Sequence, residues 1–195
     1  MVVVIQNRIF ELLKLLTQNL LLQDFKNHII TNLAFLLRSK LLIACSGGLD
    51  SIVLTRLCHI LDMDSGLAHC NFKLRGEESD GDQKFVTQLS EALDIPLYVK
   101  SFDTKAYAKK NNLSIQLAAR ELRYNWFREL AGLYKFDYIL TAHHTDDSLE
   151  TFLINLSRGT GIDGLTGIPE INDVFVRPLL PFTREQIYEF ATTNS

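Results

Sequence analysis

The chain has 195 residues, of which 47% are apolar and 22% are charged, and its formal net charge is −3. This length corresponds to about one α/β domain with a single substantial core, and the composition excludes a disordered chain. The small negative charge argues against attraction of the whole surface to nucleic acid, although it leaves room for a local basic patch. No uncharged apolar run is long enough for a membrane span, so no membrane association is expected.

The first 39 residues are predicted to be helical. Apolar side chains recur at helical spacing in two runs, namely Ile9, Leu12, Leu13, Leu16 and Leu20, and then Phe25, Ile29, Leu33, Leu36 and Leu37. Polar residues interrupt the apolar start before a signal-peptide core can form. We therefore expect residues 1–39 to form a helical segment packed on a domain that covers residues 40–195.

From residue 40 onward, short apolar runs alternate with helical patterns. The runs that indicate buried parallel strands are 41–45, 66–71, 96–101, 138–142 and 174–177, and the helical stretches are 50–62, 79–93, 104–132 (broken near Asn111) and 146–157. This alternation predicts an α/β fold with a doubly wound, parallel, five-stranded sheet. Ligands bind such sheets beyond the carboxyl ends of the strands. Polar residues stand at those ends: Ser46, Asn71, Ser101 and His143.

The most specific stretch is the loop after the first strand, Ser46-Gly47-Gly48-Leu49-Asp50-Ser51. Its two glycines let the backbone turn tightly and bring N–H groups close to an anion, and the helix that follows adds its dipole. The loop lacks the lysine of a Walker A motif, so it predicts a different kind of phosphate cradle. The carboxylate of Asp50 suggests a bridging Mg²⁺. The alternative is a glycine turn in which Asp50 only caps the helix.

The SGGxDS loop resembles that of the N-type ATP pyrophosphatases, the PP-loop superfamily. Three further stretches, HCNFKLRGEESDGDQKFV (69–86), IQLAARELRYNWF (115–127) and TAHHTDDSLETFLINLSRGTGIDGLTGI (141–168), are similar to the tRNA(Ile)-lysidine synthetase family. The resemblance implies that ATP is cleaved to AMP and pyrophosphate while C2 of cytidine 34 is activated. That cytidine lies in the CAU anticodon of isoleucine tRNA, and free L-lysine then displaces AMP to give lysidine.

Within this chemistry, particular residues have expected roles. ATP binding is expected from Ser46, Gly47, Gly48, Leu49, Asp50, Ser51, His69 and Asn71, with Mg²⁺ on Asp50. Catalysis is expected from Asp50, Arg123, His143, Asp147 and Glu150, of which Arg123, Asp147 and Glu150 also bind lysine. Contacts to tRNA are expected from Lys73, Arg75, Arg120 and Arg158. For the basic residues the alternatives are solvated side chains and surface salt bridges.

The acidic and histidine cluster at 143–150 admits more than one interpretation. Asp147 and Glu150 lie three residues apart at a helix start, so both carboxylates share one face. They can complement the helix dipole, or they can hold a lysine ammonium and orient a neutral amine for attack; the position at a strand end favours the second. His143 is suited to stabilising charge at the α-phosphate. We discount a zinc site built from His143, His144 and Asp147, because adjacent histidines on a strand end splay apart.

Other functions stay open at this stage. A related PP-loop enzyme, such as a tRNA thiolase or an amide-forming synthetase, would share the ATP step, and a non-catalytic ATP-binding module would keep only the cradle. The known thiolases use paired cysteines. Here Cys45, Cys58 and Cys70 are odd in number and form no CxxC pair, so they predict neither a disulfide framework nor a zinc site. Each lies in an apolar run and is expected to be a small core residue in a reducing cytoplasm.

The extent of the chain departs from the family pattern. The family normally continues past this point with a further catalytic segment and tRNA-binding domains, whereas this sequence stops at Ser195. We therefore expect the C-terminal tRNA-binding domains to be absent from it, and part of the lysine pocket with them. The sequence is also compatible with a homodimer.

Overall fold

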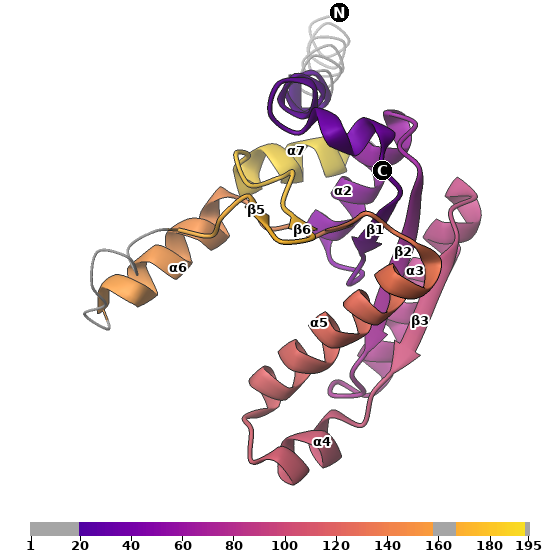
Figure 1. The fold of residues 1–195 in the computed structure, drawn as a ribbon, viewed down its shortest axis with the longest axis vertical. Coiled ribbons are helices and arrows are strands. Elements are labelled where there is room, and N and C mark those ends of the chain that lie inside the picture. The colour runs from indigo at the N-terminus through magenta and orange to yellow at the C-terminus, as the bar shows by residue number, and fades with distance from the viewer. Residues whose placement is uncertain (1–19, 158–166, 194–195) are drawn as a thin grey trace, which may run out of the picture.

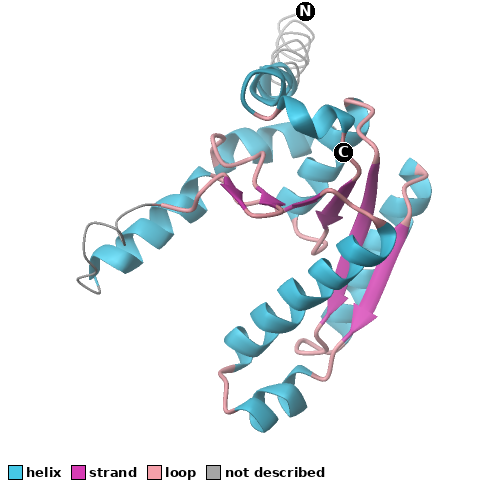
Figure 2. Cartoon of the chain, viewed as in Figure 1, coloured by secondary structure: helices cyan, strands magenta, loops and turns pink. Residues whose placement is uncertain are grey.

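The computed structural model describes residues 20–157 and 167–193, and these form an α/β fold around one sheet (Figures 1 and 2). The first predicted leading helix lies outside these ranges except for its last residue, Leu20. The strands of the sheet are β1 (Leu41–Ala44), β2 (Ser65–Asn71), β3 (Leu97–Ser101), β4 (Tyr138–Leu140), β5 (Ile171–Asn172) and β6 (Phe175–Val176). All five predicted strands are therefore present, with boundaries shifted by up to two residues.

The strand order, β3-β2-β1-β4-β6-β5, confirms a doubly wound sheet. β1 pairs in parallel with β2 on one side and with β4 on the other, so the chain connections turn in opposite directions on the two sides of β1. β2 pairs in parallel with β3, and β4 with β6. The boundary between β1 and β4 is thus the topological switch point, where ligands of such sheets bind.

The sheet has six strands where five were predicted. The additional strand, β5, pairs antiparallel with β6, with Ile171 opposite Val176. Asp173, at φ +56°, begins the two-residue turn that joins them. Both residues of β5 are exposed, so this edge strand carries no apolar pattern by which the sequence could reveal it.

The predicted helices that fall within the described residues are present, and the helix over 184–193 was not predicted. The observed helices are a helix over residues 20–32, the 3₁₀ helix η1 (Ala34–Arg38), α2 (Leu49–Ile60), α3 (Glu77–Leu93), α4 (Thr104–Asn111), α5 (Ile115–Tyr134), α6 (Thr145–Ser157) and α7 (Arg184–Thr193). The break predicted near Asn111 is confirmed. Asn112 ends α4 in a left-handed conformation, and the Ser114 side chain caps α5 by accepting the Leu117 N–H. Within the described ranges, no helix has the length and apolar character that crossing a membrane requires.

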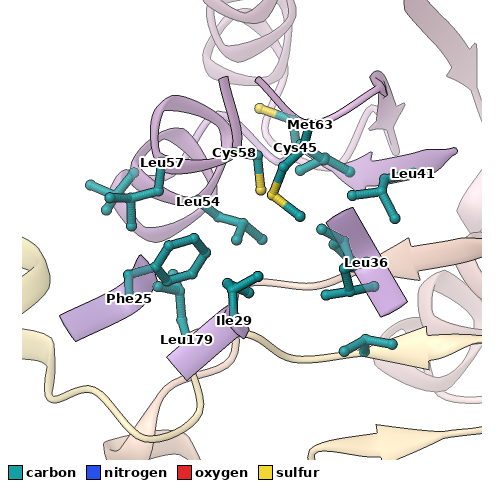
Figure 3. Close-up of a cluster of buried hydrophobic side chains, with 14 of the residues drawn as sticks. Phe25, Ile29, Leu36, Leu41, Cys45, Leu54, Leu57, Cys58, Met63 and Leu179 are labelled. Carbon is teal, nitrogen blue, oxygen red and sulfur yellow. The ribbon is translucent and has the colours of Figure 1, made fainter. Parts of the chain in front are cut away.

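Two hydrophobic clusters cover the two faces of the sheet. In one, side chains of α2, α3, α7 and the helix over residues 20–32 pack against Leu41 and Ile43 (Figure 3). In the other, α5 packs through Trp126 and Phe127 against Leu42. Successive residues of β1 therefore point into opposite clusters, as the period of two in a strand requires.

The helix over residues 20–32 contributes to the first of these clusters. Its side chains Phe25 and Ile29 are fully buried beside Leu54 and Leu57 of α2 and Leu179 (Figure 3). This part of the leading segment thus shares a core with the sheet. The division of the chain into segment 1–39 and domain 40–195 stays a prediction.

Candidate functional site

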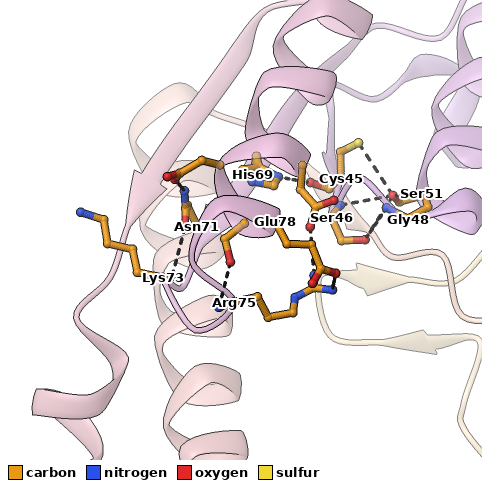
Figure 4. Close-up of polar contacts among 12 residues, drawn as sticks. Cys45, Ser46, Gly48, Ser51, His69, Asn71, Lys73, Arg75 and Glu78 are labelled. Carbon is orange, nitrogen blue, oxygen red and sulfur yellow. Dashed lines mark hydrogen bonds and ion pairs between the residues drawn. The ribbon is translucent and has the colours of Figure 1, made fainter.

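The loop between β1 and α2 is held in its turn by its own hydroxyl groups (Figure 4). The Ser51 hydroxyl donates to the Gly48 carbonyl at 2.8 Å and accepts from the Ser46 N–H at 3.2 Å. The Gly48 N–H in turn donates to the Ser46 hydroxyl at 3.2 Å. The loop is therefore shaped before any ligand arrives.

Gly47 is required by both conformation and space. Its φ is +90°, which residues with a side chain rarely adopt. A Cβ on Gly47 would lie 3.2 Å from the Cβ of Asp82 in α3. The loop can therefore lie against α3 only if this position has no side chain.

One cavity lies at the switch point, between the carboxyl ends of β1 and β4, and we call it the main cavity. Its described lining comprises Ala44, Cys45, Ser46, Gly48, Asp50, Ser51, Ala68, Cys70, Phe72, Arg123, Tyr124, Phe127, Thr141, Ala142 and His143. The main cavity thus brings together four of the predicted loop residues with Arg123 and His143. Leu49, the first residue of α2, and Gly47 shape the loop and are not part of this lining.

A second cavity adjoins the main cavity, and we call it the side cavity. It is lined by Arg120, Tyr124, His143, Asp147, Glu150, Thr151, Ile168 and Arg177. Tyr124 and His143 belong to both linings. The structure therefore places the predicted acidic pair beside the phosphate loop, with His143 at the junction.

The structure does not bring His69 and Asn71 to the main cavity, although both were predicted to bind ATP. The Nδ1 of His69, which is buried, lies 2.9 Å from the Cys45 carbonyl oxygen (Figure 4). The amide of Asn71, also buried, donates to Asp80 and Gln83 of α3 at 3.0 and 2.9 Å. Both residues fasten β2 to its surroundings.

The neighbouring residues of β2 form the cavity wall instead. Ala68 and Cys70, and then Phe72 after the strand, line the main cavity. Side chains alternate between the two faces of a strand, so odd and even positions of β2 have different functions. ATP binding by His69 and Asn71 stays a prediction, and the buried Nε2 of His69 has no hydrogen-bond partner among the described residues.

Lys73 and Arg75 lie on the turn between β2 and α3. Lys73 has φ +52°, and its N–H donates to the Asn71 side chain at 3.0 Å. The Arg75 guanidinium pairs with Glu78 and, at 2.9 Å, with Asp82 (Figure 4). Its predicted contact with tRNA would have to compete with these carboxylates.

The two arginines of α5 serve different cavities. Arg123 lines the main cavity, with its guanidinium carbon 5.2 Å from the centre of the Phe72 ring. Arg120 lines the side cavity, and its guanidinium carbon lies 5.0 Å from the centre of the Tyr124 ring. Both contacts are in the range of cation–π attraction, which orients the guanidinium groups.

Asp147 caps the start of α6 and also lines the side cavity. Its Oδ2 accepts the backbone N–H of His144 at 2.9 Å, so the side chain caps the start of α6. The same side chain also lines the side cavity with Glu150, which is exposed. Capping and ligand binding are therefore compatible at this position.

His143 has the electrostatic surroundings of a neutral imidazole. Its Nδ1 lies 3.0 Å from the Thr141 hydroxyl. Burial lowers the pKa of His143, and the positive charges of Arg177, Arg120 and Arg123 lower it further, although Asp147 opposes them. At neutral pH this ring can therefore share hydrogen bonds at the junction of the cavities without a full charge.

His144 lies in different surroundings from His143. It is buried, and its Nε2 lies 3.7 Å from Asp50 Oδ2 and 3.6 Å from Asp147 Oδ2. Within residues 20–157 and 167–193, no group of three or more His, Cys, Asp or Glu side chains is arranged to hold a metal ion. A Mg²⁺ ion carried in with nucleotide phosphates needs fewer protein ligands, and the Asp50 carboxylate in the cavity lining fits that requirement.

Two further arginines, Arg158 and Arg177, differ in how the sequence prediction treated them. Arg158, a predicted tRNA contact, lies outside the described residues. Arg177, which was not predicted, follows β6 directly and lines the side cavity. The signal was present, because Arg177 is the polar residue at the end of the fifth predicted strand, in the position that Ser46 and His143 hold after theirs.

A parallel sheet with a glycine loop at its switch point defines a nucleotide-binding α/β domain. The chain belongs to the PP-loop domain family, whose model matches residues 19–195. This is an ATP-binding domain, so the predictions of the superfamily, of the fold class and of ATP are confirmed.

Several curated relatives share most of the chain. The tRNA(Ile)-lysidine synthase of Bacteroides thetaiotaomicron is 50% identical over 156 residues, which are 80% of this chain and 37% of the relative. That of Porphyromonas gingivalis is 50% identical over 147 residues, 75% of this chain and 32% of the relative. That of Chlorobaculum tepidum is 44% identical over 153 residues, which are 76% of this chain and 46% of the relative. The chain thus spans about a third to a half of the length of these relatives.

Solved structures with the same fold include enzymes of different chemistry. The U34-tRNA thiolase NcsA of Methanococcus maripaludis matches with a TM-score of 0.65 at 18% identity, over 80% of this chain and 57% of its own. The NMN synthetase of Francisella tularensis matches with a TM-score of 0.62 at 16% identity, over 90% of this chain and 69% of its own. At these identities the likeness shows the fold alone.

Proposed function

We propose that the protein containing this chain ligates lysine to C2 of cytidine 34 in the CAU anticodon of isoleucine tRNA. ATP adenylates the tRNA with release of pyrophosphate, and lysine then displaces AMP. Relatives that are 44–50% identical over at least 75% of this chain bear the name tRNA(Ile)-lysidine synthase, which supports the proposal.

The observation that carries the proposal is the pair of adjoining cavities. A reaction in two steps needs a place for the nucleotide and a separate place for the amine, with the reacting carbon between them. The main cavity and the side cavity meet at Tyr124 and His143. A simple ATP-binding module would need only the main cavity.

In the first step, the main cavity receives the nucleotide. The loop from Ser46 to Ser51 supplies N–H and hydroxyl groups for the departing pyrophosphate, and the start of α2 adds its dipole. The guanidinium of Arg123 and the ring of His143 are placed to stabilise charge at the α-phosphate. Mg²⁺, when bound with the phosphates through Asp50, would neutralise part of their charge.

In the second step, the amine of lysine attacks from the side cavity. An amine is a nucleophile only when neutral, so its site must favour loss of a proton close to the reacting carbon. Asp147 and Glu150 supply two carboxylates for the other ammonium group. The lowered pKa of His143 leaves its ring able to accept a proton as the new C–N bond forms.

The wider assignments belong to the same proposal. Lys73, Arg75, Arg120 and Arg158 are proposed to contact tRNA phosphates, with Arg75 exchanging a carboxylate partner for a phosphate. We place the protein in the cytoplasm, where tRNA is modified, and treat a homodimer as a proposal. Cys70 lines the main cavity, but burial raises its pKa to about 12, which keeps the thiol protonated and disfavours a thiolase.

The test uses the natural protein that contains this chain. ATP–pyrophosphate exchange is measured with and without unmodified isoleucine tRNA, and radioactive lysine is then followed into the tRNA. We expect exchange that depends on this tRNA, followed by lysine incorporation that is lost when cytidine 34 is replaced by uridine. Incorporation of sulfur in place of lysine, or exchange that is indifferent to tRNA, would refute the proposal.

A further inference from the structure

His144 is a buried imidazole to which the proposed function gives no role. Only 5% of the residue is exposed, and it is not among the described lining residues of the main cavity or the side cavity. Its Nδ1 has no hydrogen-bond partner among the described residues. Buried polar atoms are nearly always paired, so the surroundings of this ring need an explanation.

Carboxylate oxygens face both nitrogens of the His144 ring. The Nε2 lies 3.7 Å from Asp50 Oδ2 and 3.6 Å from Asp147 Oδ2. The Nδ1 lies 3.5 Å from Asp146 Oδ2. An ionised carboxylate only accepts hydrogen bonds, so the ring can act only as a donor toward these groups. The distances exceed the usual hydrogen-bond length, and a shift of about 1 Å would close a bond between Nε2 and Asp50.

The backbone that carries the His144 ring is fixed by the segment before α7. The N–H of the next residue, Thr145, donates to the Phe182 carbonyl at 3.0 Å. The Oδ2 of Asp146 accepts the Arg184 N–H at 2.9 Å. The imidazole is therefore held in place before a ligand binds.

Asp50 has less support than this histidine. It lies in the first turn of α2, where no capping hydrogen bond from a side chain is formed, and its carboxylate lines the main cavity. Fixing a side chain in one rotamer costs conformational entropy, and a metal ion that binds a loosely held carboxylate must overcome that cost. A fixed donor that takes one carboxylate oxygen reduces the cost and leaves the other oxygen for the metal.

We propose that His144 is a positioning residue for the metal site, because its Nε2 donates to Oδ2 of Asp50 and orients that carboxylate toward the main cavity. This inference deepens the proposed function and rests on it for the binding of Mg²⁺ through Asp50. His144 touches neither nucleotide nor metal in this arrangement and acts only through Asp50. Groups that orient a metal-binding side chain typically change the metal affinity by about 10- to 100-fold.

Asp147 is the competing partner of the His144 Nε2. Its Oδ2 already accepts the backbone N–H of His144 at 2.9 Å, so this carboxylate keeps one donor when the ring turns to Asp50. Asp50 receives no equivalent hydrogen bond from a capping side chain in α2. A bond from Nε2 to Asp50 therefore satisfies the carboxylate with the greater need, whereas a purely structural histidine would serve Asp147 alone.

The test measures how a metal ion changes the affinity for nucleotide. The natural protein that contains this chain is titrated calorimetrically with a non-hydrolysable ATP analogue, once with Mn²⁺ and once with EDTA. The ratio of the two dissociation constants reports the contribution of the metal and cancels general damage to the main cavity. In the unchanged protein we expect Mn²⁺ to tighten binding, and Asp50→Asn should remove most of this gain.

Two amide variants separate the nitrogens of the His144 ring. The amide nitrogen of His144→Gln is as many bonds from Cα as the histidine Nε2, whereas that of His144→Asn corresponds to Nδ1. We expect His144→Asn to lose about tenfold or more of the Mn²⁺-dependent gain and His144→Gln to retain it within about threefold. Affinity in EDTA should stay within about twofold in both. His59→Asn, at an exposed position near the end of α2, is the matched control and should change neither affinity.

Urea unfolding of each variant shows whether the fold is kept, and each result of the titrations is decisive. Equal losses in Mn²⁺ and EDTA would indicate a structural role and overturn the inference. So would a full gain in His144→Asn, or a gain lost as completely in His144→Gln as in His144→Asn.

The inference and the proposed function can fail separately. If Mn²⁺ does not tighten binding, or if Asp50→Asn keeps the full gain, the metal does not bind through Asp50, and the inference falls with that part of the proposed function. A gain that is lost in His144→Asn and kept in His144→Gln supports the positioning role even if the same preparation forms no lysidine from tRNA. That last result would refute only the proposed function.

Discussion

The backbone N–H of His144 donates a hydrogen bond to the Oδ2 of Asp147 at 2.9 Å, which closes the first turn of α6 beneath the side cavity. Glu150 lies one turn further and lines the same cavity, but among the described residues its side chain makes no hydrogen bond to the helix start. The two carboxylates that looked equivalent in sequence therefore differ in structure. Asp147 combines a helix cap with a position in the cavity, whereas Glu150 has only the position in the cavity.

Glu150→Gln should impair the use of lysine without destabilising the protein. The amide keeps the size of the side chain but lacks the charge that an ammonium group needs, so we expect the lysine requirement to rise about tenfold or more. Adenylated tRNA should still form, because the main cavity is unchanged. Single-turnover kinetics at several lysine concentrations measures both steps.

Two further variants complete this prediction. Asp147→Asn should add a stability loss of about 1 kcal/mol to the same kinetic defect, since it weakens the cap. Glu189→Gln removes the same charge from an exposed position in the middle of α7 and should change neither quantity. If the adenylate of the Glu150→Gln protein disappears with the lysine dependence of the unchanged protein, the amine does not bind at this carboxylate.

The phosphate loop should not tolerate a methyl group at Gly47. Gly47→Ala must hold alanine at φ +90° and press its Cβ against Asp82, so we expect a stability loss of about 1–3 kcal/mol and a severe loss of ATP–pyrophosphate exchange. Gly81→Ala is the matched control. Gly81 lies inside α3 with nothing within 4 Å of an added Cβ, so this change should stabilise by about 0.5–1 kcal/mol. Urea unfolding of both variants measures the difference, and a Gly47→Ala protein of unchanged stability would refute the strain argument.

Much of this architecture was predictable because it depends on local patterns. The loop around Gly47, the strand periodicity and the break at Asn112 each have a signal within a few residues, and the structure confirms them. The two faces of β2 were harder to predict. The prediction followed the polarity of His69 and Asn71, whereas the alternation along the strand places Ala68, Cys70 and Phe72 in the cavity wall. Polar residues at strand ends also fasten neighbouring helices.

The parts that could not be predicted depend on contacts between distant segments. β5 exists only because Ile171 meets Val176 across a short turn at the sheet edge. The polar position of Arg177 at the end of the fifth predicted strand is visible in the sequence, but the pairing of β6 with β4 and the anchoring of its guanidinium by the Pro169 carbonyl are not. No sequence period encodes such a juxtaposition, because it is fixed by tertiary packing.

Asp50→Asn should abolish the adenylation step while leaving the fold intact. The change removes a metal-binding charge but no core volume, so we expect a rate loss of about a hundredfold or more at an unchanged unfolding temperature. Asp94→Asn makes the same chemical change at the exposed left-handed C-cap of α3, where asparagine is well tolerated, and should be silent. The measurement is pyrophosphate release at several Mg²⁺ concentrations. Release at the rate of the unchanged protein would show that Asp50, which makes no capping hydrogen bond at the start of α2, has no catalytic role.

The pH response of His143 tests the electrostatics of the junction between the two cavities. Burial and the nearby guanidinium groups lower its pKa from the ordinary value of 6.5, so the folded protein binds this proton less readily than the unfolded chain. Stability therefore rises with pH through this range, is fully present above about 6.5, and is lost as pH falls through the lowered pKa. NMR titration of the ring should give a midpoint below 6.5, and urea unfolding should weaken over the same window.

Variants identify the source of the lowered pKa. Arg120→Gln removes one positive charge and should raise the His143 midpoint, whereas Asp147→Asn removes the opposing negative charge and should lower it further. His143→Gln should flatten the pH dependence of unfolding that this residue causes, and His59→Gln, at an exposed position near the end of α2, should leave it in place. A His143 midpoint at or above 6.5, unmoved by Arg120→Gln, would mean that the guanidinium groups of the side cavity do not act on this ring. The neutral imidazole proposed to accept a proton in the second step would then have to be sought elsewhere.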